Sequence, residues 1–200
     1  RLSYSDERIV TGTAAELAKE RFADLAVLLA ENRLPVGRPW NSPGLPDEVF
    51  QRGAVPMTKE EVRAVSVCKL RLQSHHVVWD VGAGTGSVSL ECAMACPAGQ
   101  VFAIEKNPEA VALLEENKAR LGASNLSVVS GTAPAALEGL PAPDRVFLGG
   151  TSGNLEDILR LVFEKNPAAR VVCTAVTLET LGEAARLFAP LAEEDMVQLS

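Results

Sequence analysis

Three glycines follow a short apolar segment in the pattern Asp80-Val-Gly82-Ala-Gly84-Thr-Gly86. Glycine lets the backbone turn tightly and approach a ligand closely. A helix expected to begin at Ser87 would direct its free N–H groups at the same place, where they attract anionic groups of a ligand. Ser87 stands where the dinucleotide fingerprint G-x-G-x-x-G requires its third glycine, so the pattern argues against NAD. The loop predicts a different nucleotide-like ligand, with a purely structural strand–helix turn as the alternative.

A carboxylate ends the next apolar segment, Val101-Phe-Ala-Ile-Glu105. In nucleotide-binding α/β proteins a carboxylate in this place accepts hydrogen bonds from ribose hydroxyls, whereas the alternative is an ordinary surface glutamate. A third segment ends in Ser130-Gly131-Thr132-Ala133, where short polar groups and backbone amides could contact an adenine edge or form a simple turn. The three segment ends together predict a site for an adenosine-containing ligand.

The segments that carry these residues alternate regularly in type along the chain. Apolar runs predict strands at 77–81, 100–105, 126–130, 144–148, 170–175 and 196–199. Helical patterns and cap residues predict helices at 87–96, 108–121, 134–137, 154–164 and 178–191. Such alternation forms right-handed βαβ units and a mainly parallel sheet, whose ligands bind beyond the carboxyl ends of the strands near the switch point. The glycine loop and Glu105 are therefore expected to meet at that edge.

Residues 1–72 lack this alternation. Thr13 and Glu16 form a capping-box pattern that predicts a helix over 14–31, and Thr58 and Glu61 form a second one that predicts a helix over 58–72. The stretch 34–56 between them is rich in proline and glycine and is expected to be irregular. Long irregular stretches in compact domains are usually functional or linkers, so we interpret this one as a linker that continues into a lid.

Composition and charge narrow the possible functions. The 200 residues are 47% hydrophobic and 22% charged, which is typical of a globular domain. The net charge of −7 argues against nucleic-acid binding, although residues 33–73 carry +3 and could form either a solvated surface or a basic rim for an anionic small molecule. Cys92 and Cys96 are expected to be reduced core residues without a metal. Neither a membrane-spanning apolar run nor a signal peptide is visible, so we expect a cytoplasmic protein.

Asp80, Gly82, Gly84, Gly86 and Glu105 together resemble the first motif and the ribose motif of the class I S-adenosylmethionine methyltransferases. The resemblance implies an α/β fold with a Rossmann-like, doubly wound and mostly parallel sheet, whose last strand would be missing because the chain stops in the sixth. It implies S-adenosylmethionine as the cofactor and S-adenosylhomocysteine as its product. The cofactor-binding residues that we expect are Thr58, Asp80, Gly82, Gly84, Thr85, Gly86, Glu105, Lys106, Gly131, Thr132, Ala133 and Gly149.

Further stretches resemble one family of this class, the decarboxylating methyltransferases of cobalamin biosynthesis. They are Gly44 to Arg63, with Pro56-Met-Thr58-Lys59 in it, Phe147-Leu-Gly149-Gly150-Thr-Ser-Gly153-Asn154, and Ala175-Val-Thr177. That family methylates carbon 15 of a precorrin and removes carbon dioxide from the ring C acetate. The residues that we expect in catalysis are Thr58, Lys59, Thr151 and Asn154. Those expected to bind the substrate are Arg52, Arg63, Gly150, Thr151, Ser152 and Thr177.

Residues 1–38 resemble the tail of a different domain, the precorrin carbon-5 methyltransferase, which precedes this one in bifunctional enzymes. We therefore expect 1–38 to be tail and linker and 39–200 to be a class I methyltransferase domain. The family's tetramers imply a homo-oligomer, with no nucleic acid and no membrane as partner. Three alternatives stay open: another small-molecule or RNA methyltransferase of the class, an NAD-binding module, and an inactive interaction domain.

Overall fold

The computed structural model describes residues 8–22, 27–29, 42–191 and 195–199. The chain divides into two units, residues 1–35 and 36–200, and each is described by itself. In the first unit the capping box is confirmed, because the Thr13 side chain accepts from the Glu16 N–H and Glu16 Oε2 accepts from the Thr13 N–H at 2.7 Å. The helix that it opens, α1 (Ala14–Leu17), is far shorter than expected.

The expected helix over 14–31 is wrong for the residues that the structure describes, because 18–22 and 27–29 are not helical. Residues 23–26 and 30–31 lie outside the described part of the chain. Apolar side chains within the expected helix are exposed, Leu28 by 79% and Leu29 by 94%. Helices in proteins are stabilised mainly by packing an apolar face, and α1 buries none of its residues. The assignment of 1–38 to the tail of another domain stays a prediction.

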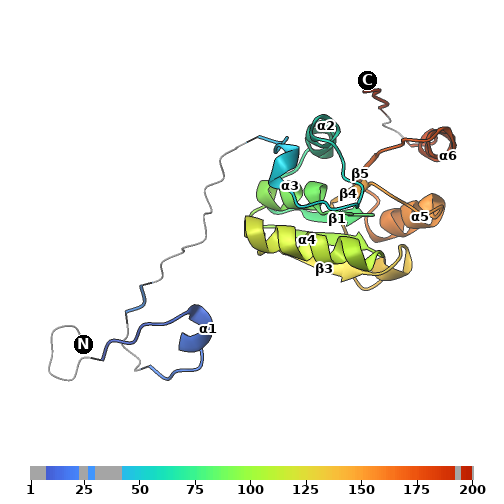
Figure 1. Cartoon of the computed structure of the whole chain (residues 1–200). Helices are drawn as coiled ribbons and strands as arrows, with labels where there is room; N and C mark the ends of the chain where they lie inside the picture. The colour runs from blue at the N-terminus through green and yellow to red at the C-terminus, as the bar shows by residue number, and fades with distance from the viewer. Residues whose placement is uncertain (1–7, 23–26, 30–41, 192–194, 200) are drawn as a thin grey trace. The chain divides into compact units, whose positions relative to one another are not determined.

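The second unit is built on a sheet of five parallel strands (Figure 1). The strands are β1 (Val77–Val81), β2 (Gln100–Glu105), β3 (Leu126–Ser130), β4 (Arg145–Leu148) and β5 (Arg170–Cys173). Their order in the sheet is β3-β2-β1-β4-β5, so the chain builds outward from β1 in one direction and then returns to add β4 and β5 on its other side. The switch point lies between β1 and β4, and the expected α/β doubly wound fold is confirmed.

Helices cover both faces of this sheet (Figure 1). Alternate strand residues point to opposite faces, so Val78 and Phe147 pack on one side while Trp79 and Leu148 pack on the other. The first side is covered by α2 (Glu60–Leu70), α3 (Ser87–Ala95) and α4 (Pro108–Leu121). The second is covered by the 3-10 turn η2 (Ala135–Leu137), α5 (Leu155–Lys165) and α6 (Leu178–Phe188). A further 3-10 turn, η1 (Asp47–Val49), precedes α2.

One expected strand and one expected helix cap of this unit are wrong. Residues 195–199 form no strand, and the sheet of the described residues ends at β5. Val197 is 51% exposed, and a strand forms only where a neighbour satisfies its N–H and C=O groups. The second capping box is also not formed, since α2 begins at Glu60 after Lys59, which makes no side-chain cap. The Thr58 carbonyl accepts a hydrogen bond from Arg63 Nη1 at 2.5 Å instead. None of the helices described is long and apolar enough to cross a membrane.

Candidate active site

The glycine loop touches the loop that follows β4, at the switch point of the sheet. The N–H groups of Gly149 and Gly150 both donate to the Val81 carbonyl, at 3.0 and 3.2 Å. Gly82 has a φ of +75°, and a Cβ added to it would lie 2.6 Å from the Gly150 carbonyl oxygen. Such a distance is far below van der Waals contact, so a residue other than glycine would force the two loops apart. Gly82 is therefore required for the contact between the two loops.

Asp80, the last residue but one of β1, carries a fully buried carboxyl group. Ser89 Oγ donates to its Oδ2, while Oδ1 is buried and has no hydrogen-bond partner among the described residues. Burial raises the pKa of Asp80 to about 7, against the hydrogen bonds from Ser89, which lower it. The Thr85 Oγ1 in the glycine loop is likewise buried without a partner in the described part of the chain. Buried polar atoms of this kind are costly, so their presence fits a loop that binds a polar ligand.

The raised pKa of Asp80 predicts a pH dependence of stability. A carboxyl group whose pKa is higher in the fold than in the unfolded chain stabilises the fold below its unfolded value, near 3.8, and this contribution is lost as pH rises through about 7. We expect wild type to lose stability relative to Asp80→Asn between pH 5 and 7, by on the order of 1 kcal/mol per pH unit, and no further above pH 8. Urea unfolding of both proteins from pH 5 to 8.5 measures this. Parallel pH profiles would show that Asp80 does not titrate as described.

Glu105 holds the glycine loop from the end of β2. Its Oε2 accepts from the Gly84 N–H at 2.8 Å, and its Oε1 accepts from the N–H groups of Lys106 and Asn107, both at 2.8 Å. The side chain is nearly buried. A carboxylate has about four acceptor positions, so at least one remains for a further donor. The strand-end position of Glu105 follows from the sequence, but its bond to the glycine loop does not.

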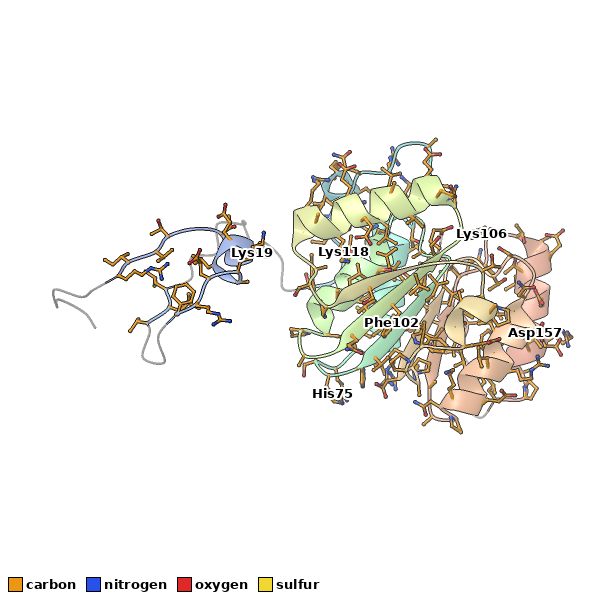
Figure 2. The ribbon with its side chains drawn as sticks, turned by 90° about the horizontal axis from the view of Figure 1, so that it is seen from below. Lys19, His75, Phe102, Lys106, Lys118 and Asp157 are labelled. Atoms are coloured by element: carbon orange, nitrogen blue, oxygen red, sulfur yellow. The ribbon has the colours of Figure 1, made fainter. Side chains whose placement is uncertain are left out.

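Side chains also connect the loops after β2, β3 and β4. Lys106, labelled in Figure 2, donates from Nζ to Ser152 Oγ at 2.8 Å. Asn154 occupies the N-cap position of α5 but does not cap it with its side chain. Its Nδ2 donates to the Ala133 carbonyl at 3.0 Å, and the Gly131 N–H donates to the Glu105 carbonyl at 3.0 Å. The structure thus brings the expected residues of these three loops together at one edge of the sheet.

Arg63 lies in the core and not on a basic rim, which corrects its expected contact with substrate. Its side chain is 0% exposed, and Nε donates to Glu91 Oε1 at 2.6 Å. Nη1 donates to Asp47 Oδ1 at 3.1 Å, and Nη2 donates to the Leu45 carbonyl. Because α2 and α3 pack together, this guanidinium is enclosed and cannot reach a ligand. Arg63 is therefore excluded from the substrate-binding residues.

Glu91, which the sequence patterns did not single out, completes this buried cluster from α3. Besides pairing with Arg63, it accepts from the N–H groups of Gly44 and Leu45 at 2.8 and 2.9 Å. Its carboxylate therefore anchors the start of the 44–58 segment. At the other end of that segment, the Pro56 carbonyl oxygen lies 3.1 Å from where a Cβ on Gly84 would be. The segment is thus fixed at one end in the core and lies against the glycine loop at the other, next to Thr58.

Several of the remaining expected site residues are exposed, whereas Thr151 is half-buried. Lys59 is 59% exposed and forms an ion pair with Asp47 at 3.2 Å, and Arg52 is exposed without a resolved ion pair in the described residues. Thr177 follows β5 and caps α6, because its Oγ1 accepts from the Thr180 N–H at 3.2 Å. Thr132 and Thr151 contribute backbone carbonyls to their own turns. Arg52 and Lys59 are thus exposed basic side chains that a ligand can reach.

Comparison with known proteins shows which family the sequence of this chain resembles. The model of the family described as "Precorrin methyltransferase domain" matches residues 48–197. The chain is 43% identical over 146 residues to the probable cobalt-precorrin-6B C(15)-methyltransferase (decarboxylating) of Pyrobaculum calidifontis, an alignment that covers 72% of this chain and 75% of that protein.

Solved structures show the same relationship. The precorrin-6y C5,15-methyltransferase structure from Geobacter metallireducens matches with a TM-score of 0.70 and 41% identity, over 74% of this chain and 79% of that one. The C-terminal domain of precorrin-6Y C5,15-methyltransferase from Rhodobacter capsulatus matches with a TM-score of 0.70 and 32% identity, over 78% and 86% of the two chains. With the class I fold and the intact glycine loop, these matches show that the chain belongs to the precorrin methyltransferase domain family.

Proposed function

We propose that this domain catalyses the S-adenosylmethionine-dependent methylation of a precorrin at carbon 15, coupled to decarboxylation of the ring C acetate, in cobalamin biosynthesis. The observation that carries the proposal is the meeting of the glycine loop, Glu105 and the β4 loop at the switch point of a chain in this family. The names of its relatives supply the precorrin, the methylated carbon and the decarboxylation, and the family resemblance of the sequence supplies the ring C acetate.

The residues at this edge fit S-adenosylmethionine. Its adenosine would be held by Glu105 and Lys106 and by Gly131, Thr132 and Ala133, and its amino-acid part by the glycine loop with Asp80, Thr85, Thr58 and Gly149. Asp80 Oδ1 and Thr85 Oγ1, which are buried and have no partner among the residues that the structure describes, support this assignment, because a polar ligand would give them partners. When bound, the cofactor supplies an electrophilic methyl group on its sulfonium.

The residues of the chain then have to bind and orient the two reactants and to exclude water. Holding two reactants in a reactive geometry lowers a barrier by roughly 7–11 kcal/mol. The 44–58 segment is suited to this task, because it is anchored by Glu91 and lies against Gly84. We assign four side chains to the reacting centre: Thr58 at the end of this segment, Lys59 next to it, and Thr151 and Asn154 after β4. Gly150, Ser152 and Thr177 complete the proposed substrate surface with Arg52 and Lys59.

Calorimetry and turnover test this function directly. We expect the protein to bind S-adenosylhomocysteine and not NAD, and to transfer a labelled methyl group to the precorrin substrate with release of one carbon dioxide per methyl group. If the protein binds S-adenosylhomocysteine but methylates no precorrin, it is a methyltransferase that acts on another substrate. Absence of S-adenosylhomocysteine binding in the folded protein would overturn the proposal.

The exposed rim predicts a salt-dependent substrate affinity. Precorrins carry many carboxylates, and exposed charges are screened over about 8–10 Å at physiological salt. We expect Arg52→Ala to raise the substrate KM about two- to fivefold at low salt, with a smaller difference at 0.5 M salt. The affinity for S-adenosylhomocysteine should stay unchanged. Arg120→Ala is the matched control, because Arg120 is an exposed arginine in the last turn of α4, at the opposite edge of the sheet. If the kinetics of Arg52→Ala equal those of Arg120→Ala, Arg52 is not part of the substrate site.

The domain organisation of the longer chain and the oligomeric state are part of the same proposal. We propose that residues 1–38 are the tail of a carbon-5 methyltransferase domain in a longer cytoplasmic chain and that the protein forms a homotetramer. Support for the first point is the solved relative from Rhodobacter capsulatus, which is described as a C-terminal domain.

A further inference from the structure

A buried carboxamide on α4 joins the 44–58 segment to the glycine loop. Asn117 is 0% exposed, and its Oδ1 accepts from the Gln51 N–H at 2.8 Å. Its Nδ2 donates to the Gln51 carbonyl at 2.8 Å and to the Thr85 carbonyl at 3.0 Å. Both Nδ2 protons are therefore used, and Asn117 gives Gln51 the pair of bonds that a neighbouring strand would give.

The same part of α4 packs closely against both backbone segments. A Cβ on Gly86 would lie 2.7 Å from Leu114 Cγ, and a Cβ on Gly53 would lie 3.6 Å from Leu113 Cδ1. Beyond Gly53 the segment reaches Pro56, whose carbonyl lies against Gly84. Residues 51–56 thus extend from α4 to the glycine loop. The side chain of Asn117 bonds both to the first of these residues, Gln51, and to Thr85 of the loop.

We propose that Asn117 is a positioning residue for the cofactor, which fixes residues 51–58 and the Thr85 backbone relative to each other before the ligand binds. The proposal rests on the proposed function, because it takes the glycine loop as the S-adenosylmethionine site. Asn117 lies behind the loop and acts through the main chain of Gln51 and Thr85. Thr85 carries the buried Oγ1 that lacks a partner in the described residues, so fixing its backbone also fixes a group that we assign to the ligand. Preassembly of a site removes an ordering cost from binding.

Binding of S-adenosylhomocysteine to Asn117→Ala, measured by calorimetry well below the melting temperature, tests the proposal. We expect the Kd to rise about tenfold, the factor that 1.4 kcal/mol of lost binding free energy produces. Hydrogen exchange at the Gln51 amide should accelerate in the same variant. Gln51→Pro removes the Gln51 N–H that donates to Asn117 Oδ1, at an exposed position, and should also weaken binding of S-adenosylhomocysteine. Phe50 before it has φ −104° and ψ 135°, which suits a residue that precedes proline.

Asn125→Ala is the matched control. Asn125 Nδ2 also donates to two backbone carbonyls, those of Ala93 at 3.1 Å and Cys96 at 2.8 Å, but it lies at the amino end of β3, away from the site. We expect a similar loss of thermal stability with a Kd within about twofold of wild type. Equal losses of affinity in Asn117→Ala and Asn125→Ala, or normal affinity in Asn117→Ala and Gln51→Pro, would overturn the positioning role. Wild type that does not bind S-adenosylhomocysteine would overturn the proposed function, and this inference with it.

Discussion

We expect replacement of Arg63 by methionine to lower the free energy of unfolding by about 3–5 kcal/mol, the range typical when one partner of a buried ion pair is removed. Methionine keeps much of the volume of the side chain, so most of the loss comes from the charge. The Glu91 side chain is only 3% exposed and would lose its charged partner, with the Gly44 and Leu45 N–H groups as its remaining donors. The backbone carbonyls of Leu45 and Thr58 would also lose their donor.

A second substitution separates charge from packing. Glu91→Gln in the Arg63→Met background removes the unpaired charge and keeps one acceptor oxygen, whereas the N–H groups of Gly44 and Leu45 bond to different oxygens of the carboxylate. We therefore expect this double variant to recover part of the lost stability in urea unfolding, although Glu91→Gln alone destabilises wild type. Such an interaction between neighbouring sites is what a double-mutant cycle measures.

Lys59→Met is the control for this cycle. Lys59 pairs with the same Asp47, but it is 59% exposed, and exposed ion pairs contribute about 0–1 kcal/mol. The control variant should therefore unfold within about 1 kcal/mol of wild type. If Arg63→Met is as stable as Lys59→Met, the guanidinium does not hold the 44–58 segment in the way that the structure indicates.

The elements with the strongest local signals could be predicted from the sequence. β1, β2, β3 and α4 have the expected bounds, because apolar runs flanked by turn residues specify buried strands and Asn107 with Pro108 specifies a helix start. The strand ends then place the glycine loop and Glu105 at one edge of the sheet. The main parts of the candidate cofactor site thus follow from local patterns and from the connection rules of parallel sheets.

Long-range contacts could not be predicted in this way. Arg63 and Glu91 are 28 residues apart, and each resembles an exposed helix charge until α2 packs against α3. Asn117 is one polar residue in a helix, and only its contact with Gln51, 66 residues away, distinguishes it. The apolar pattern at 196–199 predicted a strand that the structure does not have. A sequence pattern does not show whether a neighbouring strand is available for pairing.

Glu105→Ala should weaken S-adenosylhomocysteine binding by about 1.5–3 kcal/mol, or roughly 10- to 150-fold, the range for hydrogen bonds to a charged group. Two effects contribute to this loss. The variant removes the proposed acceptor of the ribose hydroxyls, and it frees the N–H groups of Gly84, Lys106 and Asn107, which Glu105 holds in the structure. Glu109→Ala is the control, because Glu109 is an exposed glutamate in the first turn of the adjacent α4.

An analogue of S-adenosylhomocysteine without the ribose hydroxyls separates the two effects. If Glu105 binds the ribose, wild type should prefer the natural ligand strongly, and Glu105→Ala should lose most of this preference. If Glu105 only positions the glycine loop, the substitution should weaken both ligands by the same factor, because neither depends on a hydroxyl contact. Equal weakening would therefore reassign Glu105 from the ligand to the loop, and normal affinity of Glu105→Ala for both ligands would exclude it from the site. The loop-positioning bonds are already visible in the structure, so the loss of preference is the decisive measurement for ribose recognition.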